Sequence, residues 1–395
     1  MIHLKTKEDC TGCTACYSVC KHGAVSLYND EQGFVYPMFN TDNCIECNLC
    51  NKVCPVLNFE KRNASYLRIY AARTKNDDVL MRSSSGGLFY MLASHIITQK
   101  KGVVFGVIYD NMVVKHTFTE TLEGIRAFHG SKYVQSEVRG IYEKVKDFLN
   151  QGRFVFFSGT PCQVMALRLY LRKDYDNLLT MDVICHSVPS PLIFKEYVDY
   201  VESVHHNQLV SIDMRNKANG WSHKFYYCYN FKDGTSLGDD KLKVEHWGKL
   251  FFSGLITRPS CNQCRFTNFR RVGDITLADF WDDRKKKPEA YSNKGTSLMI
   301  VSSMKGLDVF ESIRSSVYNW EITEEEALQP CLIAPYEPNP MREAFWQYHN
   351  KYGFKKSYRR YFKTSLYSKC KHRIKKILLC FHFYNLIKIG KYGKQ

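Results

Sequence analysis

The chain has 395 residues, which is too long for one small module and indicates two or three domains. Its sixteen cysteines are about 4% of the residues, well below the 8–10% that marks a disulfide scaffold. Residues 354–395 carry 13 Lys or Arg and no Asp or Glu, so subtracting these 13 from the net +17 leaves +4 for the first 353 residues. A nearly neutral body and a basic end without a nucleic-acid motif argue against nucleic-acid binding.

Two cysteine runs dominate the first 60 residues. Each has the spacing C-x2-C-x2-C-x3-C, and every cysteine of the second run stands 34 positions after its counterpart in the first. Bacterial ferredoxins bind two [4Fe-4S] clusters with this spacing, and the fourth cysteine of each run ligates the other cluster. The predicted ligands of the first cluster are Cys10, Cys13, Cys16 and Cys54, and those of the second are Cys44, Cys47, Cys50 and Cys20. Zinc is the alternative metal, which the repeated spacing and Pro55 disfavour.

The cellular compartment follows from the thiols and from hydropathy. Thiolate ligands need a reducing environment. The N-terminal nine residues lack the apolar run of a signal peptide, and no apolar stretch approaches the ~20 residues that span a bilayer. We therefore expect a cytoplasmic protein.

Residues 61–150 begin a second domain and contain two small polar segments. The Ser/Gly turn at 83–87 precedes an apolar helix that we expect to run to about Gln99. Backbone amides at a helix N-terminus can hold the pyrophosphate of a dinucleotide, and an ordinary capped helix is the other interpretation. Lys132, in the loop at 130–136, has two interpretations as well: pairing with a phosphate or flavin, or a solvated side chain.

Residues 151–320 read as α/β structure. We expect strand–turn–helix units at 153–171 and 178–204, aromatic-rich strands over 209–252, and buried strands at 274–281 and 295–302. Cys162 and Cys185 each follow the carboxyl end of an expected strand, where open α/β sheets place ligands. Together with Cys261-x2-Cys264 they form a candidate third cubane site, although the C-x2-C pair alone also fits a redox-active or zinc site. Cys331, Cys370 and Cys380 have no partner at a metal-ligand spacing, and we expect Cys228 to be a packing residue.

Several strings in a fixed order resemble the coenzyme F420 hydrogenase/dehydrogenase beta-subunit family, in the form with a fused two-cluster ferredoxin module. The resemblance covers about residues 1–320. The strings that carry it are Ser83-Ser-Ser-Gly-Gly87, Gly130-Ser-Lys-Tyr-Val-Gln-Ser136, Gly159-Thr-Pro-Cys-Gln163, Cys185-His-Ser-Val-Pro-Ser-Pro191, Cys261-x2-Cys264, Asp274-Ile-Thr-Leu-Ala-Asp-Phe-Trp281 and Lys294-Gly-Thr-Ser-Leu298.

The resemblance implies a fold and a set of cofactors. The implied fold class is a multidomain α+β and α/β chain, with a bacterial-type 2[4Fe-4S] ferredoxin module at 1–60 and an α/β flavin-binding domain in two parts, 61–150 and 151–320. The implied third [4Fe-4S] cluster has the ligands Cys162, Cys185, Cys261 and Cys264. The implied FAD contacts are Ser83, Ser84, Ser85, Gly86, Gly87, Ser131, Lys132, Tyr133, Gly159, Thr160 and Pro161.

The resemblance also implies an oxidoreductase. Cubane clusters carry single electrons and hydride carriers carry pairs, so a flavin converts between them. We expect electrons to pass between the clusters and FAD, and to or from a deazaflavin-like or other small-molecule acceptor. By analogy with some bacterial relatives, the protein could take part in surface-polysaccharide assembly. The alternative is an electron-transfer subunit without its own substrate, which docks on a ferredoxin or a partner dehydrogenase. His186 is the nearest candidate for acid–base catalysis, and a structural role for it is equally expected.

Residues 321–395 form the remaining segment, basic and partly amphipathic. Its lysines and arginines and the apolar stretch Ile377–Ile387 allow two interpretations. One is peripheral contact of residues 354–395 with the inner face of a membrane. The other is a C-terminal helix packed on the body.

Overall fold

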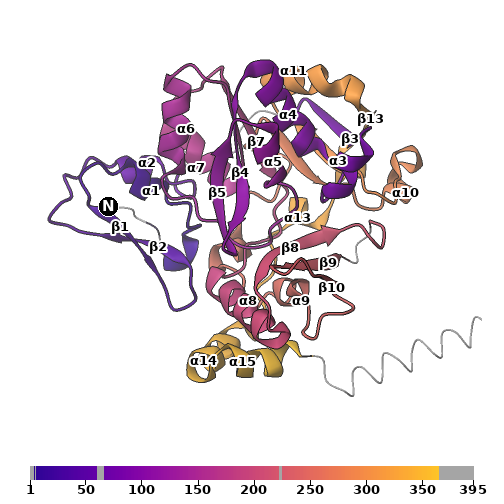
Figure 1. Cartoon of the computed structure of the whole chain (residues 1–395). Helices are drawn as coiled ribbons and strands as arrows, with labels where there is room; N and C mark the ends of the chain where they lie inside the picture. Colours follow the sequence, from indigo (N-terminus) through magenta and orange to yellow (C-terminus); the bar gives the residue numbers. More distant parts are fainter. Residues whose placement is uncertain (1–3, 5, 60–65, 222–224, 364–395) are drawn as a thin grey trace, which may run out of the picture.

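The computed structural model describes residues 4, 6–59, 66–221 and 225–363. A central body contains one large sheet, a smaller sheet lies below it in Figure 1, and the N-terminal module projects from one side. Most of the basic C-terminal segment, residues 364–395 with Cys370, Cys380 and the apolar stretch Ile377–Ile387, lies outside the described residues.

The N-terminal module has two short helices and a β-hairpin. Each helix begins next to a cysteine run, and a left-handed residue, Thr14 or Asn48, precedes it. The hairpin pairs its strands antiparallel, from Val25 opposite Phe39 to Asn29 opposite Val35. The elements are η1 (Lys7–Asp9), α1 (Ala15–Val19), β1 (Val25–Asn29), β2 (Val35–Phe39) and α2 (Leu49–Lys52).

The large sheet is a mixed eight-stranded sheet in the order β13-β3-β12-β11-β7-β6-β4-β5. Its four middle strands, β11, β7, β6 and β4, are parallel, and the outer strands pair antiparallel. The bounds are β3 (Arg68–Thr74), β4 (Val103–Asp110), β5 (Val113–Thr119), β6 (Val155–Gly159), β7 (Leu178–Val183), β11 (Ile275–Asp279), β12 (Ser297–Val301) and β13 (Val317–Glu321). Residues before and after position 150 therefore build the same sheet.

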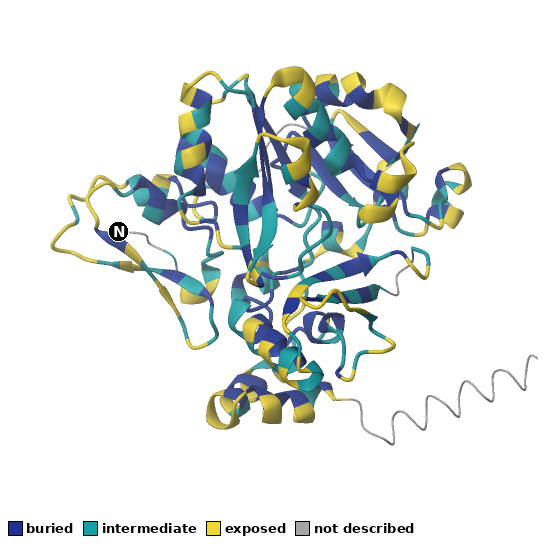
Figure 2. Cartoon of the chain, in the orientation of Figure 1, coloured by how far each residue is buried: buried dark blue, intermediate teal, exposed yellow. Residues whose placement is uncertain are grey.

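Helices cover both faces of this sheet (Figure 1). On one face α4 (Leu88–Lys100) and α11 (Met304–Ile313) share an apolar core with the strands. On the other face α6 (Ile141–Asn150) and α7 (Pro161–Leu171) do the same. Because both faces are covered, the middle strands are almost wholly buried, as Figure 2 shows, and their apolar runs were readable from the sequence. The short elements around the sheet are α3 (Asp77–Arg82), α5 (Leu122–Arg126), η2 (Pro259–Gln263), α10 (Asp283–Lys286), η3 (Pro288–Ala290), η4 (Arg314–Ser316), α12 (Glu324–Ala327) and α13 (Pro330–Ile333).

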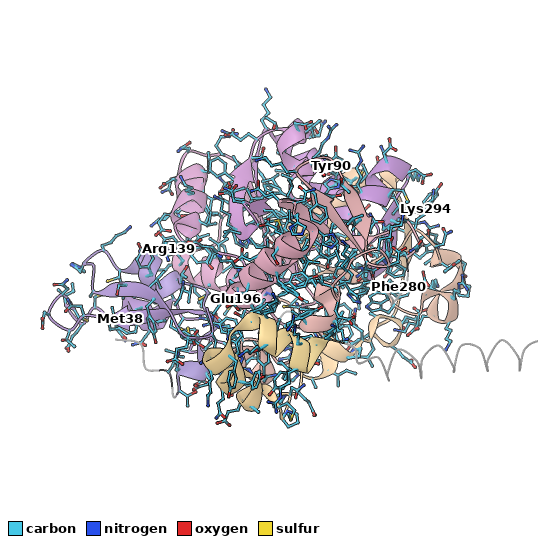
Figure 3. All side chains as sticks on the ribbon, turned by 60° about the horizontal axis from the view of Figure 1, so that its bottom comes forward. Met38, Tyr90, Arg139, Glu196, Phe280 and Lys294 are labelled. Atoms are coloured by element: carbon cyan, nitrogen blue, oxygen red, sulfur yellow. The ribbon has the colours of Figure 1, made fainter. Side chains whose placement is uncertain are left out.

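The smaller sheet is antiparallel and packs on helices from the middle and the end of the chain. Its order is β10-β9-β8, and its core contains Trp247, Tyr227 and Trp346. Figure 3 shows Glu196 beside the yellow C-terminal helices, where its carboxylate lies 2.8 Å from His349 Nε2. The elements are α8 (Pro191–His205), β8 (Leu209–Asn216), β9 (Tyr226–Phe231), β10 (Ser236–Gly238), α9 (Trp247–Phe251), α14 (Arg342–Tyr352), α15 (Phe354–Ser357) and the π-helical turn η5 (Tyr358–Phe362).

Two expectations change at this end of the chain. The strands expected over 209–252 stop earlier, because Trp247, Leu250 and Phe251 face the core from one helical turn, α9. Of the basic segment, residues 354–363 pack on the body through Phe354, Tyr358 and Phe362. This described part favours the packed interpretation over membrane contact. Among the described residues no helix is long and apolar enough to cross a membrane.

The tip of the β1–β2 hairpin anchors the module on the body. Ser190, which caps α8, donates a hydrogen bond from its Oγ to the carbonyl oxygen of Gln32 at 2.5 Å. Gly33 follows with φ +77°, and a Cβ there would lie 2.3 Å from Leu192 Cβ. The approach of the hairpin to α8 therefore requires glycine at this position.

We predict that Gly33→Ala loosens this anchor. Overpacking costs about 1–3 kcal/mol, so hydrogen exchange in the hairpin and at the start of α8 should accelerate about tenfold or more. Gly23→Ala is the matched control, because Gly23 also has a positive φ, +66°, but its Cβ would meet nothing within 4 Å. Equal acceleration in both variants would show that backbone strain, and not the contact with Leu192, is responsible.

Candidate iron–sulfur and cofactor site

The first predicted group of ligands comes together in the structure. Its four thiols, Cys10, Cys13, Cys16 and Cys54, line one small cavity of about 20 Å³. Burial raises the pKa values of Cys13, Cys16 and Cys54, and the neighbouring thiols raise them further. Thiols that resist ionisation in this way need a cation to become thiolates, which is the chemistry of a metal-cluster site.

For the second predicted group of ligands the structure gives fewer contacts between the thiols. Cys50 lies within electrostatic range of Cys16 and Cys54, so the two groups are neighbours. Cys20 is the C-cap residue of α1, and Cys47 is exposed. The ligand role of Cys44, Cys47, Cys50 and Cys20 stays a prediction.

A third group of thiols gathers where the module meets the body. Burial raises the pKa of Cys185 most, and Cys261, Cys162 and Cys264 raise it further. Burial likewise raises the pKa values of Cys261 to about 12 and of Cys264 to about 11. The structure thus unites the four cysteines that the sequence separates by up to 102 positions, from Cys162 to Cys264. Their role as ligands remains a prediction.

A single zinc ion fits these thiols poorly. Zinc holds its sulfur ligands at about 2.3 Å, so the sulfurs must lie within about 4 Å of each other. Among the described residues no three His, Cys, Asp or Glu side chains are close enough to share one metal ion. A cubane is larger than a single zinc ion and sets its four cysteines further apart.

The structure adds a fifth thiol that the sequence did not single out. Cys331 on α13 acts electrostatically on both Cys185 and Cys264. Its Sγ lies 3.6 Å from His186 Nδ1, and burial lowers the pKa of His186. No spacing signal marks Cys331, because the chain folds back over the site more than 60 residues after Cys264.

A cavity of about 460 Å³ lies beside the third group, and Cys185 belongs to its wall. It opens at the carboxyl ends of β6, β7 and β11, which is where parallel α/β sheets place ligands. Its volume falls in the range of about 300–1,000 Å³ typical of cofactor sites. Aromatic side chains also line the cavity, namely Phe225, which precedes β9, and Phe251 and Phe252 at the end of α9.

Most of the predicted cofactor contacts line this cavity. They are Ser83, Ser84, Ser85, Gly87, Ser131, Lys132, Tyr133, Gly159 and Thr160. The remaining two stand behind the wall. Gly86 packs so tightly that a Cβ would lie 2.3 Å from the carbonyl oxygen of Ala72, and Pro161 is the first residue of α7. Whether these residues bind FAD stays a prediction.

Polar groups in the cavity wall have unmet hydrogen-bonding capacity. Ser187 Oγ and His186 Nε2 are buried and have no hydrogen-bond partner among the described residues. The ammonium of Lys132 donates to the carbonyl oxygens of His129 and Gly130, at 3.0 and 3.3 Å, and lies over the Tyr109 ring; burial lowers its pKa to about 8. Buried polar groups are normally paired, so the wall suits a ligand with both anionic and hydrogen-bonding parts.

Lys217 holds the Ser/Gly turn in place. From the end of β8 its Nζ donates hydrogen bonds to the carbonyl oxygens of Leu80 and Ser85, at 2.5 and 2.7 Å. The side chain is buried, and burial, with Arg215 nearby, lowers its pKa to about 7. Sequence reasoning did not find this residue, because its contact joins segments 132 positions apart.

Aromatic rings stack along one wall of the cavity. Tyr133 stacks on Phe251 and Phe225, and Phe225 stacks on Trp281. Arg215 lies 3.9 Å from the Phe225 ring centre and pairs with Asp279 at 2.5 Å. These stacked rings and the Arg215–Asp279 pair form one continuous contact layer beside the cavity.

Comparison with known proteins agrees with this geometry. Residues 9–58 match the family model of the 4Fe-4S dicluster domain. The protein is therefore an iron–sulfur protein of the electron-transfer class.

The second family match is more specific. Residues 152–326 match the family model that describes the C terminus of the coenzyme F420 hydrogenase/dehydrogenase beta subunit. The two matches confirm the resemblance stated from the sequence, and the chain is related to those beta subunits.

Similarity to a solved structure is more distant. A chain of the F420-reducing [NiFe] hydrogenase complex from Methanosarcina barkeri, studied by xenon derivatization, has a TM-score of 0.45 and 14% identity, covering 75% of this chain and 91% of that one. No curated protein matches the sequence.

We predict a pH signature for Lys217. Its pKa of about 7 in the folded protein lies below the ~10.4 of a free lysine, so the unfolded chain binds more protons between these values. The unfolding free energy of the wild type should therefore rise with pH from 7 to 10, relative to Lys217→Met, by up to a few kcal/mol.

Urea unfolding of both proteins at several pH values measures this difference. Lys195→Met is the control, because that lysine is exposed and its bond to Asp199 raises its pKa. The difference in unfolding free energy between Lys195→Met and the wild type should stay constant from pH 7 to 9. A flat difference for Lys217→Met as well would contradict the prediction.

Proposed function

We propose that this protein is an iron–sulfur flavoprotein oxidoreductase. Its two N-terminal [4Fe-4S] clusters exchange electrons with a third cluster at Cys162, Cys185, Cys261 and Cys264, and that cluster with FAD in the large cavity. One observation carries the proposal: Cys185 belongs both to the third thiol group and to the cavity wall. A cluster there lies directly beside a bound cofactor.

Contacts between the module and the body support the order of this relay. The guanidinium of Arg265 donates to the carbonyl oxygen of Val56 at 3.1 Å, and Phe59 packs edge-on against Phe266 at 5.1 Å. Tyr142 is fully buried, and the thiols of Cys13 and Cys162 both help to raise its pKa after burial itself. The first and third groups therefore lie on either side of the buried Tyr142.

The residues of the cavity have separate tasks in this scheme. Lys132 supplies positive charge for a phosphate, and the hydroxyls of Ser84 and Ser131 offer hydrogen bonds, their oxygens lying 2.9 Å apart. Thr160 Oγ1 lies 3.2 Å from Cys162 Sγ and connects the cofactor wall to the thiol group. A bound flavin would supply the exchange between single electrons and electron pairs.

The electron acceptor is a hydride-type or other small molecule, deazaflavin-like or of another kind. By analogy with relatives, the reaction could belong to surface-polysaccharide assembly. His186 is its candidate acid–base group, since it faces the cavity with a free Nε2 among the described residues. The exposed Cys47 marks the end of the module where a ferredoxin or dehydrogenase would exchange electrons. A chain that binds clusters but no flavin would instead be a substrate-free electron-transfer subunit.

Cofactor counting tests the proposal. Anaerobically purified protein should contain about twelve irons and one FAD per chain. Cys162→Ser and Cys261→Ser should each lower the iron content to about eight, because the third cluster loses a ligand. Cys228→Ser is the control, since Cys228 lies on β9 away from the thiol group and should keep about twelve. Eight irons in the unmodified protein would exclude the third cluster.

The pKa of Lys132 predicts how flavin binding depends on pH. Its ammonium loses its proton as pH rises through about 8, and with it a charge-assisted hydrogen bond worth about 1.5–3 kcal/mol. The FAD dissociation constant of the wild type should therefore rise about tenfold or more between pH 7 and 9. Fluorescence titration of deflavinated protein measures it. Lys132→Gln should bind weakly and without this dependence, and parallel curves for the two proteins would remove Lys132 from the site.

A further inference from the structure

Arg258 is a fully buried arginine between the N-terminal module and the body. It comes three residues before Cys261, at the start of η2. Its guanidinium donates to three neutral oxygens: the Cys10 carbonyl at 2.7 Å, the Val35 carbonyl at 2.9 Å and Gln135 Oε1 at 3.1 Å. The Tyr36 ring covers it at 4.4 Å.

The other buried arginines have carboxylate partners. Arg215 pairs with Asp279 and Arg271 with Asp182, at 2.5 and 3.1 Å. Arg168, partly buried, pairs with Asp274 at 3.0 Å. No ion pair joins Arg258 to a carboxylate among the described residues. Since an uncompensated buried charge costs several kcal/mol, its counter-charge must come from elsewhere.

The backbone of the first cysteine run lies against this guanidinium. A Cβ at Gly12, between Cys10 and Cys13, would lie 2.7 Å from Arg258 Nη1. Gly12 has φ +70°, so the loop both turns and admits the arginine because it has no side chain there. Gln135 Nε2 donates to the Thr11 carbonyl at 3.1 Å and completes the contact.

The positive charge also reaches the third thiol group. The backbone N–H of Cys261 donates a hydrogen bond to the carbonyl oxygen of Arg258 at 3.0 Å, so the arginine belongs to the same turn as that thiol. The guanidinium therefore lies between two groups of thiols that become anionic when they bind a cluster. A cubane with four thiolates is negatively charged and gains a further negative charge on reduction.

We propose that Arg258 is the buried counter-charge of the first and third clusters, and that it raises their reduction potentials. The part that concerns the third cluster rests on the proposed function, whereas the part that concerns the first rests on the dicluster domain alone. The step is a one-electron reduction of the cluster, with the electron supplied by an external donor such as dithionite. Arg258 keeps its proton throughout and acts as a positioning residue.

Redox titration followed by electron paramagnetic resonance tests the proposal. In Arg258→Gln the first cluster should be reduced at least tenfold less readily, a fall in midpoint potential of about 59 mV or more. The third cluster should shift in the same direction. An unchanged potential in a variant that keeps its iron would overturn the proposal.

A second variant covers the case in which Arg258→Gln fails to fold. Gln135→Glu is nearly isosteric and puts a carboxylate beside Arg258; it keeps the acceptor for Arg258 Nη1 and loses the hydrogen bond from Nε2 to the Thr11 carbonyl. It should also lower the midpoint potential by about 59 mV or more, a tenfold change in the reduction equilibrium. Gln135→Met loses both hydrogen bonds without adding charge, and its reduction equilibrium should stay within about threefold of the wild type. Equal shifts in these two variants would contradict the role of charge.

Gln32→Glu controls for adding a negative charge at the module boundary. Gln32 Oε1 accepts a hydrogen bond from Arg342 instead of Arg258, and this variant should shift the potential far less than Gln135→Glu. A shift as large would overturn the proposal. The iron content of each protein separates the proposed third cluster from the proposed role of Arg258. About eight irons per chain, without a third signal, would refute the third cluster. The first cluster would still be present, and its potential would still test Arg258.

Discussion

The N-terminal module depends on a hydrophobic core that it shares with the body. Cys13, Ala15, Val19 and Val53 pack into the same apolar cluster as helices α6 and α7. A module of about 60 residues buries little surface by itself, and metal–thiolate bonds usually supply the missing stability in so small a unit. Here the body supplies part of it, which makes the module a fixed extension of the α/β sheet (Figure 1).

The topology of the large sheet explains where the cofactor site lies. The middle strands β4, β6, β7 and β11 are parallel, so their carboxyl ends meet at one edge. Gly159 and Cys185 lie at or just after two of these ends, and aromatic side chains at the end of α9 line the resulting hollow. The thiol group and the cavity are thus two consequences of one arrangement of strands.

Local patterns were enough to predict much of this. The spacing of the eight N-terminal cysteines, the apolar strands β6 and β7, and the turns after them were readable because each depends on neighbours within about ten residues. Grouping Cys162, Cys185, Cys261 and Cys264 needed the family resemblance as well, since no spacing links them. Helix α9 carried a usable signal, the i, i+3, i+4 pattern of Trp247, Leu250 and Phe251, which its aromatic surroundings obscured.

Residues whose role comes from long-range packing were missed. Lys217 acts on a turn 132 positions away, Cys331 reaches the thiol group from α13, and Arg258 contacts a carbonyl 248 positions earlier. In sequence each is an ordinary lysine, cysteine or arginine. What distinguishes them is a polar contact with a segment far away in the sequence, and only the folded chain shows that.

These long-range contacts also decide how electrons can move through the chain. Single-electron carriers exchange efficiently only at short and stable separations, and a tethered module would sample many. Arg258 joins Cys10 and Val35 of the module to the start of η2, while Gly33 seats the hairpin on α8. The module is therefore held at two points, beside the third thiol group and at the hairpin tip. With both held, the separation of the first and third groups is set by folding and not by the length of a tether.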